Sequence, residues 1–201
     1  MILSAIFYPM TTITSVEAYA NSFSSLQMLP FIASLILAPM FVKMMLGIYH
    51  IAPQEKKTLT QLGFSFSLIC AAILSIHYYI QLTFVQQGLL NGRIEGIWQF
   101  AALNPYSFFW TLAALGYGFM GIALLCTAQV FIEKSDHALK WLFTANGIIG
   151  IGFLVGNALG IFTVNILASF TWGIPFPIVA IPIAKKFHNP ETISRKDQDF
   201  F

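Results

Sequence analysis

The stretch from His77 to Tyr106, HYYIQLTFVQQGLLNGRIEGIWQFAALNPY, holds most of the side chains that could bind a ligand. His77 and Gln81 are four residues apart, so a helix would place both side chains on one face. An imidazole and a side-chain amide each offer a hydrogen-bond donor and an acceptor. The pair predicts either a hydrogen-bonded contact between helices near the lipid headgroups or one wall of a ligand site.

Aromatic side chains follow at helical spacing. Tyr106, Trp110 and Tyr117 would form one stripe along a helix, running from the outer surface toward the middle of a membrane. Such a stripe is either an aromatic packing face or the lining of a pocket for a sterol-like, lipid or other apolar ligand. Depth counting places most of the candidates in the outer half, where they could line one cavity open to the outside. The candidate ligand-binding residues are His77, Tyr78, Gln81, Tyr106, Trp110, Tyr117, Asn157 and Asn165.

One lysine falls inside an apolar stretch. Lys43 lies roughly 12 Å from the cytoplasmic end of its expected helix, at 1.5 Å per residue. Its side chain could reach part of the way to the membrane surface, or its ammonium group could meet Glu133 or Asp136. The alternative is a site for an anion or a lipid headgroup.

Acidic residues are absent from every expected membrane span. A proton- or cation-coupled transporter usually relies on an intramembrane carboxylate, and so do carboxylate-dependent membrane enzymes. The sequence contains no HExxH, GxSxG or P-loop pattern, and Cys70 and Cys126 lie in apolar stretches without metal-ligand spacing. We therefore expect free thiols, no catalytic residue, no metal site and no cofactor. The net charge of +2 does not suggest nucleic-acid binding.

The elements that must position these residues are apolar enough to be membrane helices. The chain of 201 residues is 57% hydrophobic and 9% charged, with a mean hydropathy of +0.75. A soluble domain carries about 25% charged residues, so the solvent of this chain is lipid. A short interfacial helix at about 93–103 would place Trp98 at headgroup depth. The sequence predicts an all-α integral membrane bundle of five transmembrane helices, at 28–51, 59–84, 105–132, 138–157 and 162–184.

Lysine and arginine set the expected orientation. If the loop at 53–57 is cytoplasmic, the opposite side carries only Arg93. The positive-inside rule then places the N-terminus outside and the C-terminus inside. The expected organisation is an extracytoplasmic N-terminal stub at 1–27, one transmembrane domain at 28–184 and a cytoplasmic disordered tail at 185–201. The basic residues of the cytoplasmic side are Lys56, Lys57, Lys134, Lys140, Lys185, Lys186, Arg195 and Lys196.

Small residues form a ridge on the fourth expected helix. Gly152, Gly156 and Gly160 recur every four residues. Such a ridge lets another helix approach closely, whether it belongs to the same chain, to a second copy in a homo-oligomer, or to a membrane partner.

Several segments of the chain are distinctive: SVEAYANSF (15–23), APQEKK (52–57), YIQLTFVQQGLLNG (79–92), Glu95-Gly96, NPYS (104–107), LGYGFMG (115–121) and KWLF (140–143). Together they resemble a family of uncharacterised, hypothetical bacterial multi-pass membrane proteins, over roughly residues 15–160. Members of that family carry one more complete hydrophobic helix before the EAYA segment, where this chain has the short apolar stretch 1–9. The resemblance implies the bacterial inner membrane as the location, and it brings no known activity.

Four functions fit these observations. We favour a non-enzymatic membrane protein that binds a lipid or a small apolar ligand in its outer half. The second is a structural or accessory subunit that packs through the glycine ridge and the aromatic faces. The third is a small transporter or channel, against which an odd number of helices without an inverted repeat argues. An intramembrane enzyme using His77 comes last, because no buried acid or paired nucleophile accompanies the imidazole.

Overall fold

The computed structural model describes residues 16–93, 95–102, 104, 106–132, 136–161, 181 and 183. All regular elements in this part of the chain are helices. Four of them are long and apolar enough to cross a membrane, at Ser25–Ile51, Gln54–Leu90, Phe108–Ala128 and His137–Ala158. The expected fifth span at 162–184, apart from residues 181 and 183, the tail at 185–201 and the first part of the N-terminal stub lie outside the described residues.

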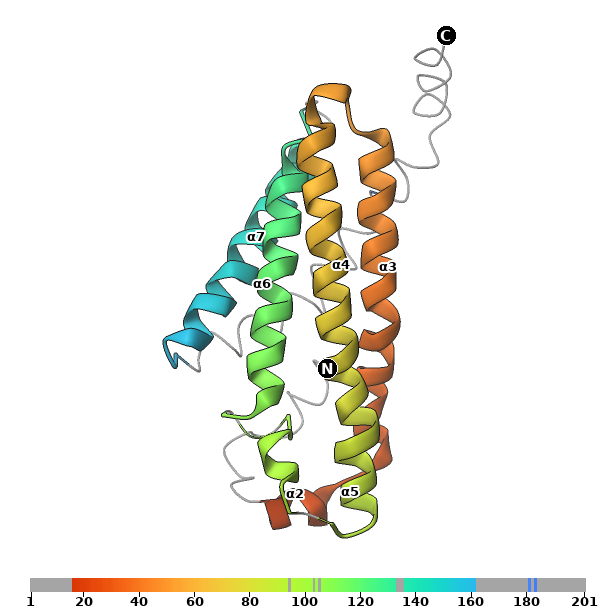
Figure 1. Cartoon of the computed structure of the whole chain (residues 1–201), viewed down its shortest axis with the longest axis vertical. Helices are drawn as coiled ribbons and strands as arrows, with labels where there is room; N and C mark the ends of the chain where they lie inside the picture. The colour runs from red at the N-terminus through yellow and green to blue at the C-terminus, as the bar shows by residue number, and fades with distance from the viewer. Residues whose placement is uncertain are drawn as a thin grey trace.

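The helices are arranged as a row (Figure 1). Helix α3 (Leu29–Ile51) packs against α4 (Lys57–Ile80), α4 against α6 (Phe108–Ala128), and α6 against α7 (His137–Ala158). The first three run close to the long axis, while α7 crosses α6 at an angle and diverges from it toward its C-terminal end. The row places α4 and α6 at the centre, where the candidate residues of both helices face each other.

The two ends of the bundle differ in structure. At one end, η1 (Ser25–Met28) leads into α3, and the short helix η2 (Gln54–Lys56) joins α3 to α4 at the other. Lys57 Nζ donates to the backbone carbonyls of Tyr49 and His50, at 3.1 and 3.3 Å, and so satisfies oxygens that the end of α3 leaves without an intrahelical partner. The end of the bundle where α3 begins also contains α2 (Val16–Ser22), α5 (Gln86–Leu90) and the loop before α6.

The second long helix extends beyond its predicted end at 84. After α4 it continues through a π-helix, η3 (Gln81–Val85), and through α5 to Leu90. A turn at Asn91-Gly92 then ends it, with Gly92 at a φ of 65°. The other spans begin and end close to the predicted positions, except that α6 covers Phe108–Ala128 instead of the predicted 105–132.

The described residues of 93–103 do not form the expected continuous interfacial helix. They contain only the 3-10 helix η4 (Ile97–Gln99), preceded by Gly96 in the left-handed region at a φ of 75°. Ile97 is buried beneath α5 against Val85 and Leu89, and Gly88 leaves the room that the Ile97 side chain fills. The segment therefore folds back as a loop that covers the end of α5, because one large apolar residue is anchored there.

Helices α6 and α7 approach closely through glycines that the predicted ridge does not include. A Cβ built on Gly121 would lie 2.6 Å from the Gly147 carbonyl oxygen, and one on Gly150 would lie 2.5 Å from the carbonyl oxygen of Tyr117. Gly152 is exposed with no side chain near it, and Gly160 forms a turn after α7 at a φ of 71°. The contact within the chain therefore uses Gly147 and Gly150. Of the predicted ridge, Gly156 is buried and Gly160 follows the end of α7, so Gly152 is the exposed member on the helix, and its contact with another molecule stays a prediction.

Candidate functional site

His77 lies on α4 inside the bundle, and only 1% of its surface is exposed. Its ring centroid is 4.7 Å from that of Tyr78 and 4.1 Å from that of Phe109 on α6. Neither ring nitrogen has a hydrogen-bond partner. A buried polar atom without a partner is rare in folded proteins and calls for an explanation.

Gln81 stands one turn after His77 and on the same face. Its Nε2 donates to the backbone carbonyl oxygen of Phe100 at 2.7 Å. This bond fixes the orientation of the amide, because only the nitrogen can donate to a carbonyl. Oε1 is consequently turned away from Phe100, and it is buried without a partner.

The loop before α6 brings a third unpaired polar atom to this region. Ser107 occupies the N-cap position of α6, but its side chain does not cap the helix, and Oγ is buried without a partner. Ser107 directly precedes Phe108, whose ring stacks on that of Phe100 at 5.4 Å, and it lies two residues before Phe109. The contacts of Phe100 with Gln81 and of Phe109 with His77 therefore hold this loop against the polar face of α4.

Hydrogen bonds make the loop itself rigid. The Asn104 side chain donates from Nδ2 to the carbonyl of Trp98 at 2.8 Å and accepts from the backbone N–H of Tyr106 at 3.0 Å. The indole of Trp110 donates to the carbonyl of Ala102 at 3.0 Å. These bonds anchor the loop both to itself and to the first turn of α6, so Ser107 is held in place.

The π-helix η3 begins at Gln81, in the same region. In it the backbone N–H of Gln86 donates to the carbonyl of Gln81, five residues back instead of the usual four. Thr83 Oγ1 also donates to the carbonyl of Tyr79 at 2.7 Å. Single π-turns within α-helices occur frequently at functional sites, because the wider turn redirects the side chains around it.

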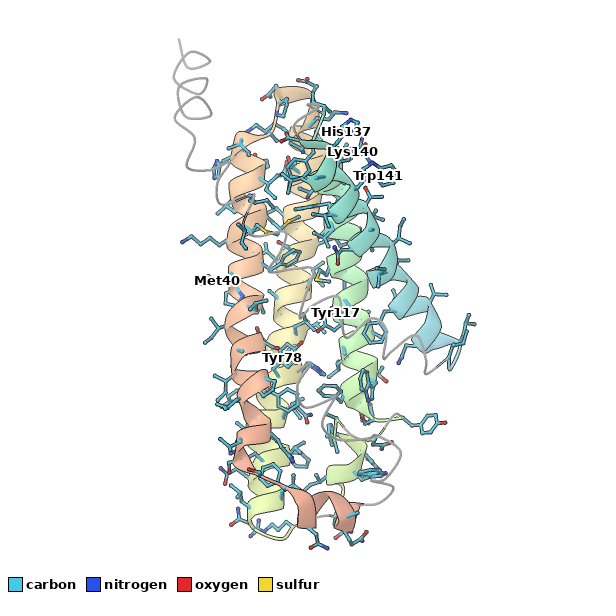
Figure 2. The ribbon with its side chains drawn as sticks, turned by 180° about the vertical axis from the view of Figure 1, so that it is seen from behind. Met40, Tyr78, Tyr117, His137, Lys140 and Trp141 are labelled. Atoms are coloured by element: carbon cyan, nitrogen blue, oxygen red, sulfur yellow. The ribbon has the colours of Figure 1, made fainter. Side chains whose placement is uncertain are left out.

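A tyrosine pair joins the helices on the bundle side of the site. The hydroxyls of Tyr78 on α4 and Tyr117 on α6 are 2.8 Å apart, and both side chains are buried (Figure 2). Phe31 of α3 packs on both Tyr78 and Phe109, with centroid distances of 6.2 and 5.8 Å. The polar atoms thus meet an aromatic wall contributed by three helices.

The structure brings together some of the predicted residues and separates others. His77, Tyr78, Gln81, Trp110 and Tyr117 are all buried on the facing sides of α4 and α6. Tyr106 is 88% exposed, so its predicted place in the aromatic stripe is wrong. It precedes the first residue of α6, and therefore does not share the helical spacing that aligns Trp110 with Tyr117.

The remaining predicted residues lie away from this site or outside the described residues. Asn157 is half-buried in the last turn of α7, and Asn165 lies outside the described residues. Lys43 is exposed on α3, and Glu133, one of its two predicted partners, is also outside them. Ser107, Phe109 and Phe31 were not predicted, because their roles depend on contacts between distant segments.

The chemistry of the described residues at this site is that of hydrogen-bond donors and acceptors beside aromatic rings. No group of three or more His, Cys, Asp or Glu side chains in this part of the chain could hold a metal ion. Cys70 and Cys126 are free thiols. The His77 imidazole packs against the rings of Tyr78 and Phe109, and no described nucleophile is hydrogen-bonded to it. The site can donate and accept hydrogen bonds in an apolar environment.

No protein-family model matches the chain, and no curated protein or solved structure is significantly similar to it. The class of protein is defined by the fold alone: the described part of the chain is helical and contains four helices of the length and apolar composition that cross a membrane.

Proposed function

We propose that this chain is a non-enzymatic, multi-pass membrane protein that binds a lipid or a small apolar ligand in its outer half, at the site around His77. The ligand site consists of the face of α4 at His77 and Gln81, the Ser107 end of the loop before α6, and the aromatic rings of Phe109 and Tyr78. We name this set of residues the His77 site.

The observation that carries the proposal is the group of buried polar atoms without partners in the His77 site. They are both nitrogens of His77, Oε1 of Gln81 and Oγ of Ser107. Each such atom destabilises a folded protein by about 1–3 kcal/mol when nothing pairs with it. Four such atoms lie on segments that contact each other through Phe100 and Phe109, and a ligand that pairs with them explains their retention better than packing does.

The surroundings of these atoms suit an apolar ligand body. Phe31, Tyr78 and Phe109 form the aromatic wall, and Tyr117 and Trp110 extend it along α6. Ligand sites of this type combine a mostly apolar and aromatic lining with a few polar groups that orient the ligand. The π-helix next to Gln81 is a segment whose hydrogen bonding is less regular, and it can adjust when a ligand enters.

The orientation that we propose follows from the charged residues of the two ends. Lys56, Lys57 and Lys140 lie at the end with η2 and the start of α7, whereas Arg93 lies at the end with α5 (Figure 1). The lysine-rich end faces the cytoplasm under the positive-inside rule, and the His77 site then lies toward the outside of a bacterial inner membrane. Trp141, exposed near the lysine-rich end in Figure 2, agrees with an aromatic residue at a membrane surface.

Single cysteines test this orientation. Both Asn91 and Gln54 are exposed and lie at opposite ends. An impermeant maleimide added to intact cells should label Asn91→Cys and leave Gln54→Cys unlabelled until the membrane is opened, with the parent chain as the control for Cys126. The reverse labelling pattern would place the His77 site on the cytoplasmic side.

Lipid analysis of the purified protein tests the ligand site. We expect a lipid to co-purify with the wild-type chain and to be lost from His77→Leu, as measured by mass spectrometry of the extracted lipids. His50→Leu is the matched control, because it makes the same change at an exposed position of α3. If His77→Leu keeps the same bound lipids as His50→Leu, the site does not bind them.

A second candidate function rests on the exposed side of α7. Gly152 has no atom near the place of a Cβ, and Ile148 and Val155 beside it are exposed. A small residue flanked by large apolar ones lets another helix pack closely, which suits an accessory subunit or a homo-oligomer. Gly152→Leu should then lower the oligomeric mass measured in detergent, whereas an unchanged mass would leave this face to lipid.

A further inference from the structure

The unpaired atoms of the His77 site select among ligand chemistries because their roles differ. Gln81 Oε1 can only accept a hydrogen bond, since the donor end of the amide is already bonded to Phe100. A neutral imidazole has one nitrogen that donates and one that accepts, and the Ser107 hydroxyl can do both. The site therefore needs a ligand that donates to Gln81 and also accepts from the protein.

Oxygens without a proton do not meet this requirement. A ketone, aldehyde, ester or ether oxygen accepts hydrogen bonds and donates none. With such a ligand, Gln81 Oε1 would stay buried and unpaired, which is unfavourable. The acceptor on Gln81 therefore favours a group with a proton on oxygen or nitrogen.

Charged groups do not suit the site either. None of the lysines and arginines among the described residues is buried, so no buried lysine or arginine of this part of the chain would neutralise a phosphate or carboxylate at the His77 site. The buried acid of the described part, Asp136, directly precedes His137 at the other end of the bundle (Figure 2), so no buried carboxylate of this part would neutralise an ammonium group at the site. Burying an unpaired charge is far less favourable than burying a neutral group.

Depth along the helix points to the same ligand class. The span Gln54–Leu90 has 37 residues, about 55 Å of helix, whereas the hydrocarbon core of a bilayer is about 30 Å thick. His77 lies about 30 Å beyond Lys57 along the axis, so with Lys57 at one membrane surface the His77 site lies at the other. An amphipathic lipid places its polar group at this boundary and its chain in the hydrocarbon.

We infer that the His77 site takes a neutral long-chain lipid with a free hydroxyl group, which donates to Gln81 Oε1 and accepts a hydrogen bond from His77 or Ser107. Residues on one helix face four positions apart have Cβ atoms about 5–6 Å from each other, so one hydroxyl oxygen can lie between the two side chains. This inference rests on the proposed ligand site and adds the chemistry of the ligand.

Three probes with the same chain test the inference on the full-length protein in detergent: oleyl alcohol, methyl oleyl ether and methyl oleate. Binding is measured by native mass spectrometry and by the shift of the unfolding temperature with probe concentration. We expect oleyl alcohol to bind at least tenfold more tightly than the ether or the ester, because one further hydrogen bond in a buried site contributes about 1.5 kcal/mol, and 1.4 kcal/mol is tenfold.

The variants separate failure of the inference from failure of the proposed function. His77→Leu should abolish binding of the alcohol, and Ser107→Ala and Gln81→Met should lower the alcohol-to-ether ratio. Equal binding of alcohol and ether by the wild-type chain, both lost in His77→Leu, would overturn the hydroxyl selectivity and leave the ligand site standing. Binding of all three probes that His77→Leu does not change would overturn both.

Discussion

Replacing His77 by leucine should stabilise the protein after its lipids have been removed. A polar-to-apolar change in a core is usually destabilising when it breaks hydrogen bonds, but His77 makes none through its ring. Leucine has a similar volume and no polar atom, so it fills the space between Tyr78 and Phe109 without an unpaired group. Most core substitutions lower the free energy of unfolding, so a gain in His77→Leu would show that the imidazole is unpaired.

The magnitude follows from two opposing contributions. Removing two unpaired nitrogens stabilises the folded chain by about 2–6 kcal/mol, at about 1–3 kcal/mol each. Losing the ring contacts with Tyr78 and Phe109, at 4.7 and 4.1 Å, destabilises it. Aromatic pairs contribute about 0.5–1.5 kcal/mol each. We expect a net gain of about 1–3 kcal/mol in the free energy of unfolding, which raises the unfolding temperature by about 2–12 °C for a chain of this size.

The assay is unfolding of the delipidated protein by SDS in mixed micelles, followed by circular dichroism, with His50→Leu as the control. We expect the control to stay within about 0.5 kcal/mol of the wild-type chain, because His50 is exposed. A loss of stability of 1 kcal/mol or more in His77→Leu would refute the reasoning. It would mean that the imidazole makes hydrogen bonds that stabilise the bundle, and that His77 is an interhelical contact.

Two further predictions concern the packing of the bundle. Tyr78→Phe should lower the free energy of unfolding by about 1 kcal/mol, because it removes the 2.8 Å bond between the hydroxyls of Tyr78 and Tyr117. Adding Tyr117→Phe should then have a smaller effect than it has alone, and strictly additive effects would show that the hydroxyls do not interact. Gly150→Ala should destabilise by about 1–3 kcal/mol, since its Cβ would lie 2.5 Å from a backbone oxygen, whereas Gly152→Ala on the same helix meets nothing and should be neutral or slightly stabilising. Equal effects of the two alanines would contradict the described contact between α6 and α7.

The four described spans could be predicted because each is a long apolar stretch bounded by turn or charged residues. Helix α3 begins and ends within a residue of its predicted range, and α7 does the same. The end of the second span could not be placed, since polar residues begin at Gln86 while the helix continues to Leu90. The π-helix that carries it past Gln81 has no distinct sequence pattern, and Asn91-Gly92 was the better signal for its end.

The start of α6 shows how neighbouring signals compete. The predicted span begins at 105, directly after Asn104, an N-cap residue type; the Asn104 side chain closes a turn with Tyr106 instead, and the helix begins after Ser107. Both residues are good N-cap types, and they lie three positions apart. The choice between them depends on the bonds of the loop with Trp98 and Ala102, which a sequence does not reveal. Tyr106 falls outside the helix for this reason, and the predicted stripe loses its first member.

The part of the candidate site that depends only on helical spacing could be predicted from the sequence. The spacing of His77 and Gln81 is enough to place them on one face of α4, because it depends only on helical geometry. The contribution of Ser107 and Phe109 depends on the loop returning to that face, so it required the structure. The glycines that bring α6 and α7 together could not be separated from the nearby Gly152, since both sets have helical spacing and only one faces the neighbouring helix.

The stabilisation expected from a bound ligand and the stabilisation expected from replacing His77 by leucine are similar in size. A ligand present at about 100 times its dissociation constant stabilises the folded chain by about 2.7 kcal/mol. This is close to the gain of about 1–3 kcal/mol that we expect when leucine replaces His77. If the unpaired atoms are retained for a ligand, the wild-type chain saturated with oleyl alcohol should reach about the stability of delipidated His77→Leu. The alcohol should not stabilise that variant further, because the variant no longer offers the imidazole.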